Sequence, residues 1–207
     1  MAKTLYFVRH GQTEWNVQRR LQGRADSPLT AVGERQARAH HEWLRLAPPQ
    51  AIIASPLGRV RATVALINEA LDLVPEFDGD LSERCMGEFE GRSIAQIAED
   101  DPASAAVKER DPWHWLPPGG EDYDAMMVRT APVVARLAHH PAERTLVVSH
   151  GTIVRPILKH LLHLDRATTL RISSPNELAY RLERVDEETW SVTHWTGTEW
   201  TPGLQFL

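Results

Sequence analysis

Histidines follow two apolar segments of this chain at the point where each segment turns polar. Leu5–Val8 leads directly into the tripeptide Arg-His-Gly at 9–11, and 144–148 leads into Ser-His-Gly at 149–151. An imidazole can act as a nucleophile, as a general acid or base, or as a metal ligand. The residues around the two histidines indicate which of these chemistries the chain supports.

Arginines accompany these histidines. Arg9 is adjacent to His10, and Arg59 lies in the first turns after a third apolar segment, Ala51–Ser55. Guanidinium groups present forked donors that fit phosphate oxygens in two-point contacts, whereas they are poor neighbours for a metal dication. The set therefore favours phosphoryl chemistry, in which a neutral imidazole attacks phosphorus and forms a phosphohistidine.

Other chemistries lack their usual motifs. A metal site would need a third ligand, and the pair His160 and His163 lacks the glutamate of a metalloprotease helix. Ser149 is not in a G-x-S-x-G turn, and the chain has neither G-x-x-x-x-G-K-[ST] nor G-x-G-x-x-G. The single cysteine, Cys85, has no obvious base beside it and is expected to be a small packed residue.

A leaving alkoxide needs a proton, so a carboxylic acid or a second histidine should face the nucleophile. Glu83, in the segment DLSERCMGEFEG, is the candidate, in a loop that Gly87 and Gly91 keep tight. Glu88 and Glu90 are close enough in sequence to remain alternatives.

Hydrophobic periodicity indicates strands that alternate with helices. The expected strands are 5–8, 51–55, 144–149, 178–185 and 190–195, and the expected helices are 30–46, 56–71 and a segment ending near 162. This alternation predicts an α/β fold with a mostly parallel sheet. Ligands bind beyond the carboxyl ends of such strands, where all of the polar segments above fall.

The pattern is weaker between residues 72 and 141. Asp111–Asp122 (DPWHWLPPGGED) is rich in Pro and Gly and predicts a long structured loop, with a cap or lid at about 85–125 in a single domain, 1–207. Trp113 and Trp115 are expected to cover the core, with substrate contact as the alternative.

Composition excludes several classes of protein. The net charge is −5 with no concentrated basic segment, which disfavours a nucleic-acid partner and requires that positive charge be gathered locally in any anion pocket. No apolar stretch approaches the ~20 residues of a membrane-spanning helix. We expect no signal peptide, and the single cysteine fits a reducing compartment, so a cytoplasmic location is predicted.

Six motifs, taken together and in order, resemble the histidine phosphatase superfamily, in its phosphoglycerate mutase-like branch. They are RHGQTEWN, RLQGRADSPLT, SPLGRVRAT, LSERCMGEFEG, PPGGED and VVSHGT, and they cover about Leu5 to Thr152. A lone RHG would be weak evidence, whereas the ordered set is highly specific.

The resemblance implies a three-layer α/β/α sandwich and a mechanism without metal or cofactor. It implies that His10 is the phosphorylated nucleophile and Glu83 the proton donor to the leaving group. It implies that Gly11 lets the backbone approach the anion. The remaining phosphate-pocket and substrate-side residues that it implies are Arg9, Arg59, His150, Gly151, Asn16, Gln22 and Gly23, with helix capping as an alternative role for Asn16.

Within this family we favour a phosphatase that hydrolyses small phosphomonoesters, of sugar phosphate or phosphoglycerate type. Mutases of the family are longer, with insertions that exclude water, whereas this chain looks trimmed. Arg84 follows Glu83 as in the mutases, and it either binds an anionic part of the substrate or points into solvent. A cofactor-dependent phosphoglycerate mutase and a non-catalytic phosphate-ester binding module are the alternatives, and analogy with relatives suggests a homodimer.

Overall fold

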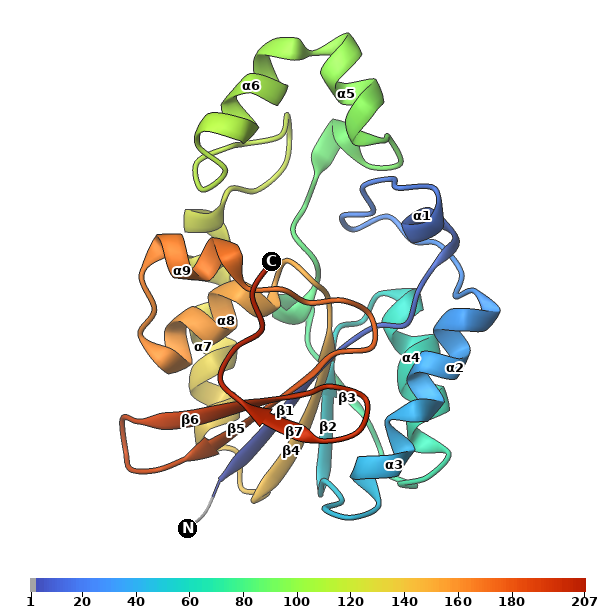
Figure 1. The fold of residues 1–207 in the computed structure, drawn as a ribbon, viewed down its shortest axis with the longest axis vertical. Helices are drawn as coiled ribbons and strands as arrows, with labels where there is room; N and C mark the ends of the chain where they lie inside the picture. Colours follow the sequence, from blue (N-terminus) through green and yellow to red (C-terminus); the bar gives the residue numbers. More distant parts are fainter. Residues whose placement is uncertain (1–2) are drawn as a thin grey trace.

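The computed structural model describes residues 3–207, and a seven-stranded sheet lies at its centre. The strands are β1 (Thr4–Arg9), β2 (Ala51–Ala54), β3 (Glu76–Phe77), β4 (Arg144–Ser149), β5 (Ala179–Arg184), β6 (Trp190–Trp195) and β7 (Trp200–Pro202). Their order is β3-β2-β4-β1-β5-β6-β7 (Figure 1). The first four pair in parallel, and β5, β6 and β7 are added antiparallel at one edge. The predicted strands are therefore confirmed, and the two late ones form a hairpin.

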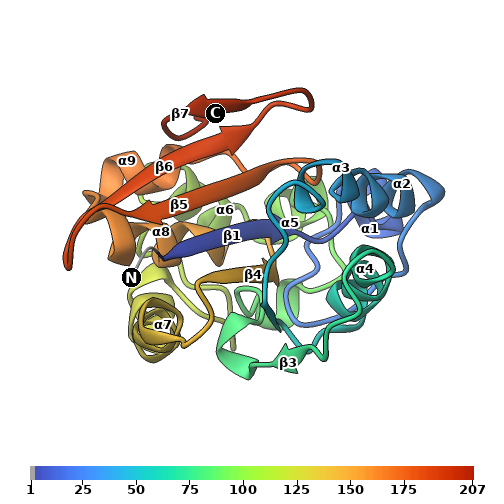
Figure 2. The same ribbon diagram turned by 90° about the horizontal axis from the view of Figure 1, so that it is seen from below.

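Helices cover both faces of this sheet. They are α1 (Glu14–Val17), α2 (Ala31–Ala39), α3 (His41–Leu44), α4 (Gly58–Asn68), α5 (Ile94–Asp100), α6 (Pro102–Arg110), α7 (Tyr123–His139), α8 (Val154–Leu162) and α9 (Arg166–Arg171), with 3₁₀ turns η1 (Gly79–Leu81) and η2 (Gly87–Phe89). Figure 2 shows α2, α3 and α4 on one side of the sheet and α7 and α8 on the other.

Alternation along the central strand separates the two cores. In β1, Leu5 and Phe7 pack toward α7 and α8, whereas Tyr6 and Val8 pack toward α2, α3 and α4. Successive side chains of a strand point to opposite faces, so a fully apolar strand needs cover on both sides. The predicted α/β/α sandwich is confirmed.

The helix predicted at 30–46 is interrupted. Thr30 caps its start as expected, with its side chain accepting a hydrogen bond from the Gly33 N–H. At His40 the backbone N–H bonds to the Ala37 carbonyl, three residues back instead of four. This tighter turn ends α2, and α3 follows it directly.

The helix predicted at 56–71 begins at Gly58 and not at Pro56. Leu57 is the N-cap residue and has no side-chain hydrogen bond to offer. The cap is supplied instead by Asp26, whose carboxylate accepts the Arg59 N–H from 33 residues away. A contact between such distant segments leaves no local signal at Pro56.

The region of weak pattern contains three helices that the sequence did not predict. α7 supplies Met126, Val133 and Leu137 to one core, although Pro132 stands in its middle. Proline removes the N–H that would bond to the Val128 carbonyl, and Val128 is exposed, so water can take its place. α5 and α6 extend beyond the sheet, at the end of the molecule opposite the N-terminus (Figure 1).

The tryptophans of the 111–122 loop are packed, as the preferred interpretation predicted. Trp113 stacks on Tyr123 with 4.9 Å between ring centroids, and its Nε1 donates to the Asp124 carboxylate. Trp115 stacks on Phe89 beneath α5 and α6. Both are at most 3% exposed, so neither ring faces solvent.

Hydropathy of the helices gives one further result. Within residues 3–207, every helix is too short or too polar to cross a bilayer.

A buried histidine makes the fold sensitive to acid. His40 accepts a hydrogen bond from Trp43 Nε1 at 3.2 Å, and burial lowers its pKa to about 4. Between pH 6.5 and 4 the unfolded chain binds this proton and the folded chain does not, so the free energy of unfolding falls as the pH falls. His40→Asn keeps an acceptor for Trp43. It should reduce the slope of the free energy of unfolding against pH by about 1.4 kcal/mol per pH unit, measured by urea unfolding.

His163→Asn is the matched control for this substitution. His163 is exposed and has φ of 53°, a conformation that asparagine accepts. The slope of its free energy of unfolding against pH should equal that of the unsubstituted protein. Equal slopes for the unsubstituted protein, His40→Asn and His163→Asn would contradict the role given to His40.

Candidate active site

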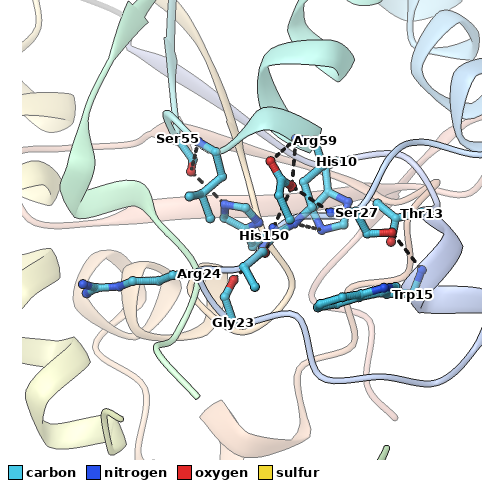
Figure 3. A network of polar contacts seen from close by, with 12 residues as sticks. His10, Thr13, Trp15, Gly23, Arg24, Ser27, Ser55, Arg59 and His150 are labelled. Carbon is cyan, nitrogen blue, oxygen red and sulfur yellow. Dashed lines mark hydrogen bonds and ion pairs between the residues drawn. The ribbon is translucent and has the colours of Figure 1, made fainter. Parts of the chain in front are cut away.

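The parallel strands bring the predicted polar segments to one edge of the sheet. Val8 of β1, Val148 of β4 and Ala54 of β2 are register partners, so the residues that follow them are neighbours. The rings of His10 and His150 consequently lie 5.2 Å apart between centroids, at 64° to one another (Figure 3). The convergence expected from the sequence is confirmed.

His10 is held as a neutral imidazole with its lone pair on Nε2. Its Nδ1 hydrogen-bonds to the Gly11 carbonyl at 2.8 Å, which requires a proton on Nδ1. Nε2 accepts a hydrogen bond from Arg59 Nε at 3.3 Å, which requires that Nε2 carry none. Burial, with the charges of Arg9 and Arg59, lowers the pKa of His10 well below its usual value of 6.5. The ring is therefore in the form that can attack phosphorus.

Residues of one loop, 23–26, hold the guanidinium group of Arg59 in place. Its Nη2 donates to the Gly23 carbonyl at 2.8 Å, and its Nη1 donates to the Ala25 carbonyl and to the Asp26 carboxylate at 2.7 and 3.1 Å. The side chain has no exposed surface. Gly23 is predicted for the substrate side, and its φ of +53° turns the loop so that its carbonyl faces Arg59.

Arg9 lies against the backbone of Gly151. Its Nη1 donates to the Ser174 carbonyl at 2.7 Å, and a Cβ at position 151 would lie 3.1 Å from its Cζ. Any side chain at 151 would therefore displace the guanidinium. This contact accounts for the glycine at position 151, which follows His150.

Gly11 has a different reason to be glycine from the one predicted. A Cβ there would lie 2.2 Å from the Gly33 carbonyl oxygen of α2, and the Gly11 N–H donates to Thr63 Oγ1 at 3.1 Å. The close approach of this backbone to an anion stays a prediction. The missing side chain makes room for helix α2.

His150 is oriented by Ser55. The Ser55 Oγ atom lies 2.8 Å from His150 Nε2 and also accepts a hydrogen bond from the Leu57 N–H. When the hydroxyl is the donor to Nε2, a neutral His150 carries its proton on Nδ1 and can donate it. Burial and the nearby charges of Arg59, His10 and Arg9 lower the pKa of His150 well below 6.5.

Glu83 is the carboxylate that the fold brings beside these histidines. It is 9% exposed, and its oxygens accept hydrogen bonds from the Thr152 and Ile153 N–H groups at 3.1 Å and from Arg84 N at 2.8 Å. These partners directly follow His150 and Gly151. Glu88 is exposed to solvent, so it is not an alternative.

Half of the buried polar atoms without a partner belong to predicted site residues. Among residues 3–207, six buried side-chain nitrogen or oxygen atoms make no hydrogen bond, and three of them are Arg9 Nε, Gln22 Oε1 and His150 Nδ1. The other three belong to Arg181, Arg184 and Thr193 on β5 and β6. Buried polar groups normally have partners, and a ligand can supply the partner that the protein does not. Turning the Gln22 amide would present its NH₂ group in place of the oxygen.

Asn16 and Arg84 have structural partners. The Asn16 side chain forms a capping box with Thr13, so its alternative role as a helix cap is confirmed. Arg84 is 4% exposed, and its Nε and Nη2 donate to the carbonyls of Glu121 and Trp115. The prediction that Arg84 points into solvent is wrong, because its guanidinium lies over the rings of Trp115 and Tyr123.

Glu90 has a function in the site that the sequence did not reveal. Its Oε1 accepts from the N–H groups of Arg24 and Met86, at 2.8 and 3.1 Å, and its Oε2 accepts from Ala25 N at 2.9 Å. It thus holds the loop whose carbonyls hold Arg59. Residues 24 and 90 are 66 positions apart, and neither neighbourhood marks the contact.

Acidic and imidazole groups are otherwise dispersed. Within the described chain, no three His, Cys, Asp or Glu side chains are grouped so that they could hold a metal ion.

Comparison with known proteins identifies relatives along nearly the whole chain. The model of the histidine phosphatase superfamily (branch 1) matches residues 5–198. A protein of Salmonella paratyphi C named "Probable phosphoglycerate mutase GpmB" is 34% identical over 196 residues, which are 92% of this chain and 89% of the relative.

Solved structures show the same fold. The mycobacterial glucosyl-3-phosphoglycerate phosphatase in complex with VO3 has a TM-score of 0.83 and 31% identity, over 93% of this chain and 98% of its own. The α-ribazole phosphatase of Shigella flexneri also has a TM-score of 0.83, at 24% identity over 90% and 93% of the two chains.

Both site histidines should stay neutral under mild acid. We expect the ring ¹⁵N shifts of His10 and His150 to report the Nδ1–H tautomer and to remain constant from pH 7.5 to 6, because burial beside arginines disfavours a second positive charge. Histidine in a model peptide, which titrates near 6.5, is the reference. His10→Gln and His150→Gln assign the signals, and titration of either ring near 6.5 would contradict this electrostatic account.

Glu90→Gln should disturb the site from a distance. One oxygen that accepts an N–H becomes an NH₂ group, so loop 23–25 shifts and Arg59 with it. We expect kcat/KM for a phosphate ester to fall about 10- to 100-fold and the His10 Nε2 shift to move.

Glu88→Gln, two residues away and exposed, is the matched control and should change neither quantity. Lower activity of Glu90→Gln with an unmoved His10 signal would mean that Glu90 acts on stability alone.

Proposed function

The chain belongs to the histidine phosphatase superfamily (branch 1), and we propose that it is a phosphatase that hydrolyses small phosphomonoesters through a phosphohistidine on His10, without a metal. One observation carries the proposal. His10 carries its lone pair on Nε2, where its one hydrogen-bond partner is Arg59 Nε at 3.3 Å, next to Arg9 and His150, while its Nδ1–H is bonded to a backbone carbonyl.

The phosphate group is bound by donors that have no other partner. Arg9 Nε and the Nδ1–H of His150 are buried and unpaired, and each can donate to a phosphoryl oxygen. Arg59 adds positive charge at the His10 nitrogen that attacks. Fixed donors in a site that excludes water stabilise the charge that develops on the transferred group.

In the first step, His10 Nε2 forms a bond to phosphorus while the bond from phosphorus to the ester oxygen breaks. The leaving alkoxide takes a proton from the Glu83 carboxyl group and departs as the alcohol. The products of this step are the phosphohistidine, the alcohol and the Glu83 carboxylate.

In the second step, a water molecule attacks the phosphohistidine. The Glu83 carboxylate accepts the proton of that water as its oxygen bonds to phosphorus, and the bond to His10 Nε2 breaks. Inorganic phosphate leaves, and His10 is neutral again. The same carboxyl group therefore serves as acid and then as base.

A cavity beside the site gives water access to the phosphohistidine. It measures about 350 Å³ and is lined by both Arg9 and Glu83. The 31% identity to a mycobacterial glucosyl-3-phosphoglycerate phosphatase supports hydrolysis over transfer back to an organic acceptor. The relative named as a phosphoglycerate mutase keeps that activity as the second candidate.

The reaction with 3-phosphoglycerate separates these activities. We expect ³¹P NMR to show free phosphate, with no requirement for 2,3-bisphosphoglycerate and no loss of rate in EDTA. Formation of 2-phosphoglycerate that depends on the bisphosphorylated primer would establish the mutase instead. Loss of activity in EDTA that zinc or magnesium restores would overturn the metal-free mechanism.

His10→Ala should lower kcat by at least ~10³-fold while the circular dichroism spectrum stays that of the folded protein. Alkaline quenching during turnover should yield acid-labile phosphate on the unsubstituted protein and none on this variant. His163→Ala, on the exposed surface, is the matched control. Binding of phosphate esters without turnover of any of them would favour the non-catalytic alternative.

A further inference from the structure

The peptide unit that joins His10 to Gly11 is held by side chains and not by the sheet. Its carbonyl oxygen accepts a hydrogen bond from Asn176 Nδ2 at 2.7 Å, and its N–H donates to Thr63 Oγ1 at 3.1 Å. β1 ends one residue earlier, at Arg9. Within residues 3–207, neither end of this peptide unit has a backbone partner. Two side chains from distant segments therefore set the orientation of the peptide plane.

The amide of Asn176 suits its place at the carbonyl end. A carbonyl oxygen can only accept, so the NH₂ group of the amide must face His10. Asn176 lies between α9 and β5, and 166 positions separate it from His10. His10 is 2% exposed, so without this amide its carbonyl would lose a donor at a buried position, which is costly.

The segment around Asn176 also holds other groups of the site. Arg9 Nη1 donates to the Ser174 carbonyl at 2.7 Å, and Ser174 Oγ donates to the Gly151 carbonyl at 2.8 Å. Ser174 and Asn176 thus contact both of the strand ends that carry the site histidines. Each of the contacts on the strand ends is made to backbone or to Arg9, so this segment fixes the position of the chain on which the nucleophile stands.

The orientation of the held peptide controls the His10 ring. The next carbonyl along the chain is that of Gly11, and it accepts from His10 Nδ1 at 2.8 Å. If the peptide plane rotated, this carbonyl would move away from the ring. The hydrogen bond at one ring nitrogen of a histidine sets which nitrogen carries the proton. Loss of the contact would therefore allow the proton to move to Nε2, where it blocks attack.

The same contact gains strength during the proposed reaction. When Nε2 bonds to phosphorus, the ring keeps its proton on Nδ1 and acquires positive charge. The hydrogen bond from Nδ1 to the Gly11 carbonyl then has a charged donor, and such bonds are the stronger ones. Interactions that are stronger in the transition state than in the ground state raise kcat. Holding this carbonyl in place beforehand should consequently act on kcat more than on KM.

We propose that Asn176 is a positioning residue for the nucleophile, and the proposal rests on the phosphatase function above. Asn176 holds the His10–Gly11 peptide in the orientation in which the Gly11 carbonyl keeps the proton on Nδ1 of His10. Asn176 is not among the residues that line the cavity beside the site. It acts on the reaction through His10 and not through the substrate.

Asn176→Leu tests this role, because it removes the donor and keeps nearly the same size. The probe is p-nitrophenyl phosphate, whose leaving group departs as a stable anion, so the rate does not depend on a proton from Glu83. We expect kcat to fall about 10- to 100-fold and KM to change less than about threefold. Without substrate, the ring ¹⁵N shifts of His10 should move from the Nδ1–H tautomer toward an average of both tautomers.

Asn68→Leu is the matched control for this substitution. Asn68 Nδ2 donates to the Leu73 carbonyl at 2.7 Å, which is the same kind of contact, at the end of α4 remote from the site. We expect this variant to lose stability in urea while kcat and the His10 shifts stay unchanged. Equal losses of kcat in both variants, or an unmoved His10 signal in Asn176→Leu, would overturn the proposal and leave Asn176 a structural role.

Two further variants separate the hydrogen bond from the packing of the side chain. Asn176→Asp keeps the shape and places an acceptor against the His10 carbonyl, so kcat should fall at least as far as in Asn176→Leu. Asn176→Gln retains an NH₂ group and should recover part of the loss. Activity of Asn176→Asp equal to that of the unsubstituted protein would overturn the proposal.

The outcomes also distinguish this proposal from the phosphatase function. An unchanged kcat and unchanged His10 shifts in Asn176→Leu would overturn the positioning role while the phosphatase function stands. Failure of the unsubstituted protein to form a phosphohistidine with any ester would overturn the phosphatase function and the positioning role with it.

Discussion

An uncharged imidazole buried against two guanidinium groups is the interaction on which the rest of this structure depends. His10 remains neutral because a further positive charge beside Arg9 and Arg59 would be costly without water. Its Nδ1–H bond to Gly11 fixes the tautomer, so that the lone pair lies on the nitrogen nearest Arg59. The contact between Arg59 and His10 thus places positive charge beside the nitrogen that we propose as the nucleophile. His10 does not have to lose a proton before it can react.

The surrounding structure holds the cations in place, because two buried guanidinium groups repel one another. Arg9 is bound to the Ser174 carbonyl and packed on Gly151, and Arg59 is bound by loop 23–26. That loop is in turn held by the Glu90 carboxylate. The anions of the site are thus placed on the outer side of the arginines, as acceptors of backbone N–H groups. Arg9 Nε and His150 Nδ1 are buried in this site without a hydrogen-bond partner.

The charge distribution explains how an acidic protein can select an anion. The chain carries a net charge of −5, yet the cavity and the nucleophile are surrounded by Arg9, Arg59 and Arg155. Asp26 pairs with Arg59, and the Glu83 carboxylate, which lines the cavity, is held by three N–H groups. The phosphate pocket that we propose is built at the edge of the sheet, and the cavity beside it is lined from α8 and the segment after α9. Relatives with one phosphate pocket and different alcohols are a natural result of this separation.

Sequence alone determined the sandwich and predicted which residues meet at one edge of its sheet. Apolar runs of strand length that end in Arg-His or Ser-His are local patterns, and parallel strands bring their carboxyl ends to one edge, so His10, Arg9, Arg59 and His150 could be predicted to meet. The strands and the helices beside them followed from the same periodicity. α7 was missed because Pro132 is a helix breaker in local terms, and its burial against the sheet outweighs that preference.

Tertiary structure decided everything that joins distant segments. It selected Glu83 from three nearby glutamates, because only Glu83 reaches the amides after Gly151. It buried Arg84 against the ring of Trp115 and placed Arg155 in the lining of the cavity. The local sequence around these two arginines does not distinguish these positions. It also brought Asp26 to the start of α4 and Glu90 to loop 23–26. Gly11 has no side chain because helix α2 packs against it. The physical cause is common to these cases: hydrogen bonds and close packing between residues tens of positions apart leave no trace in local composition.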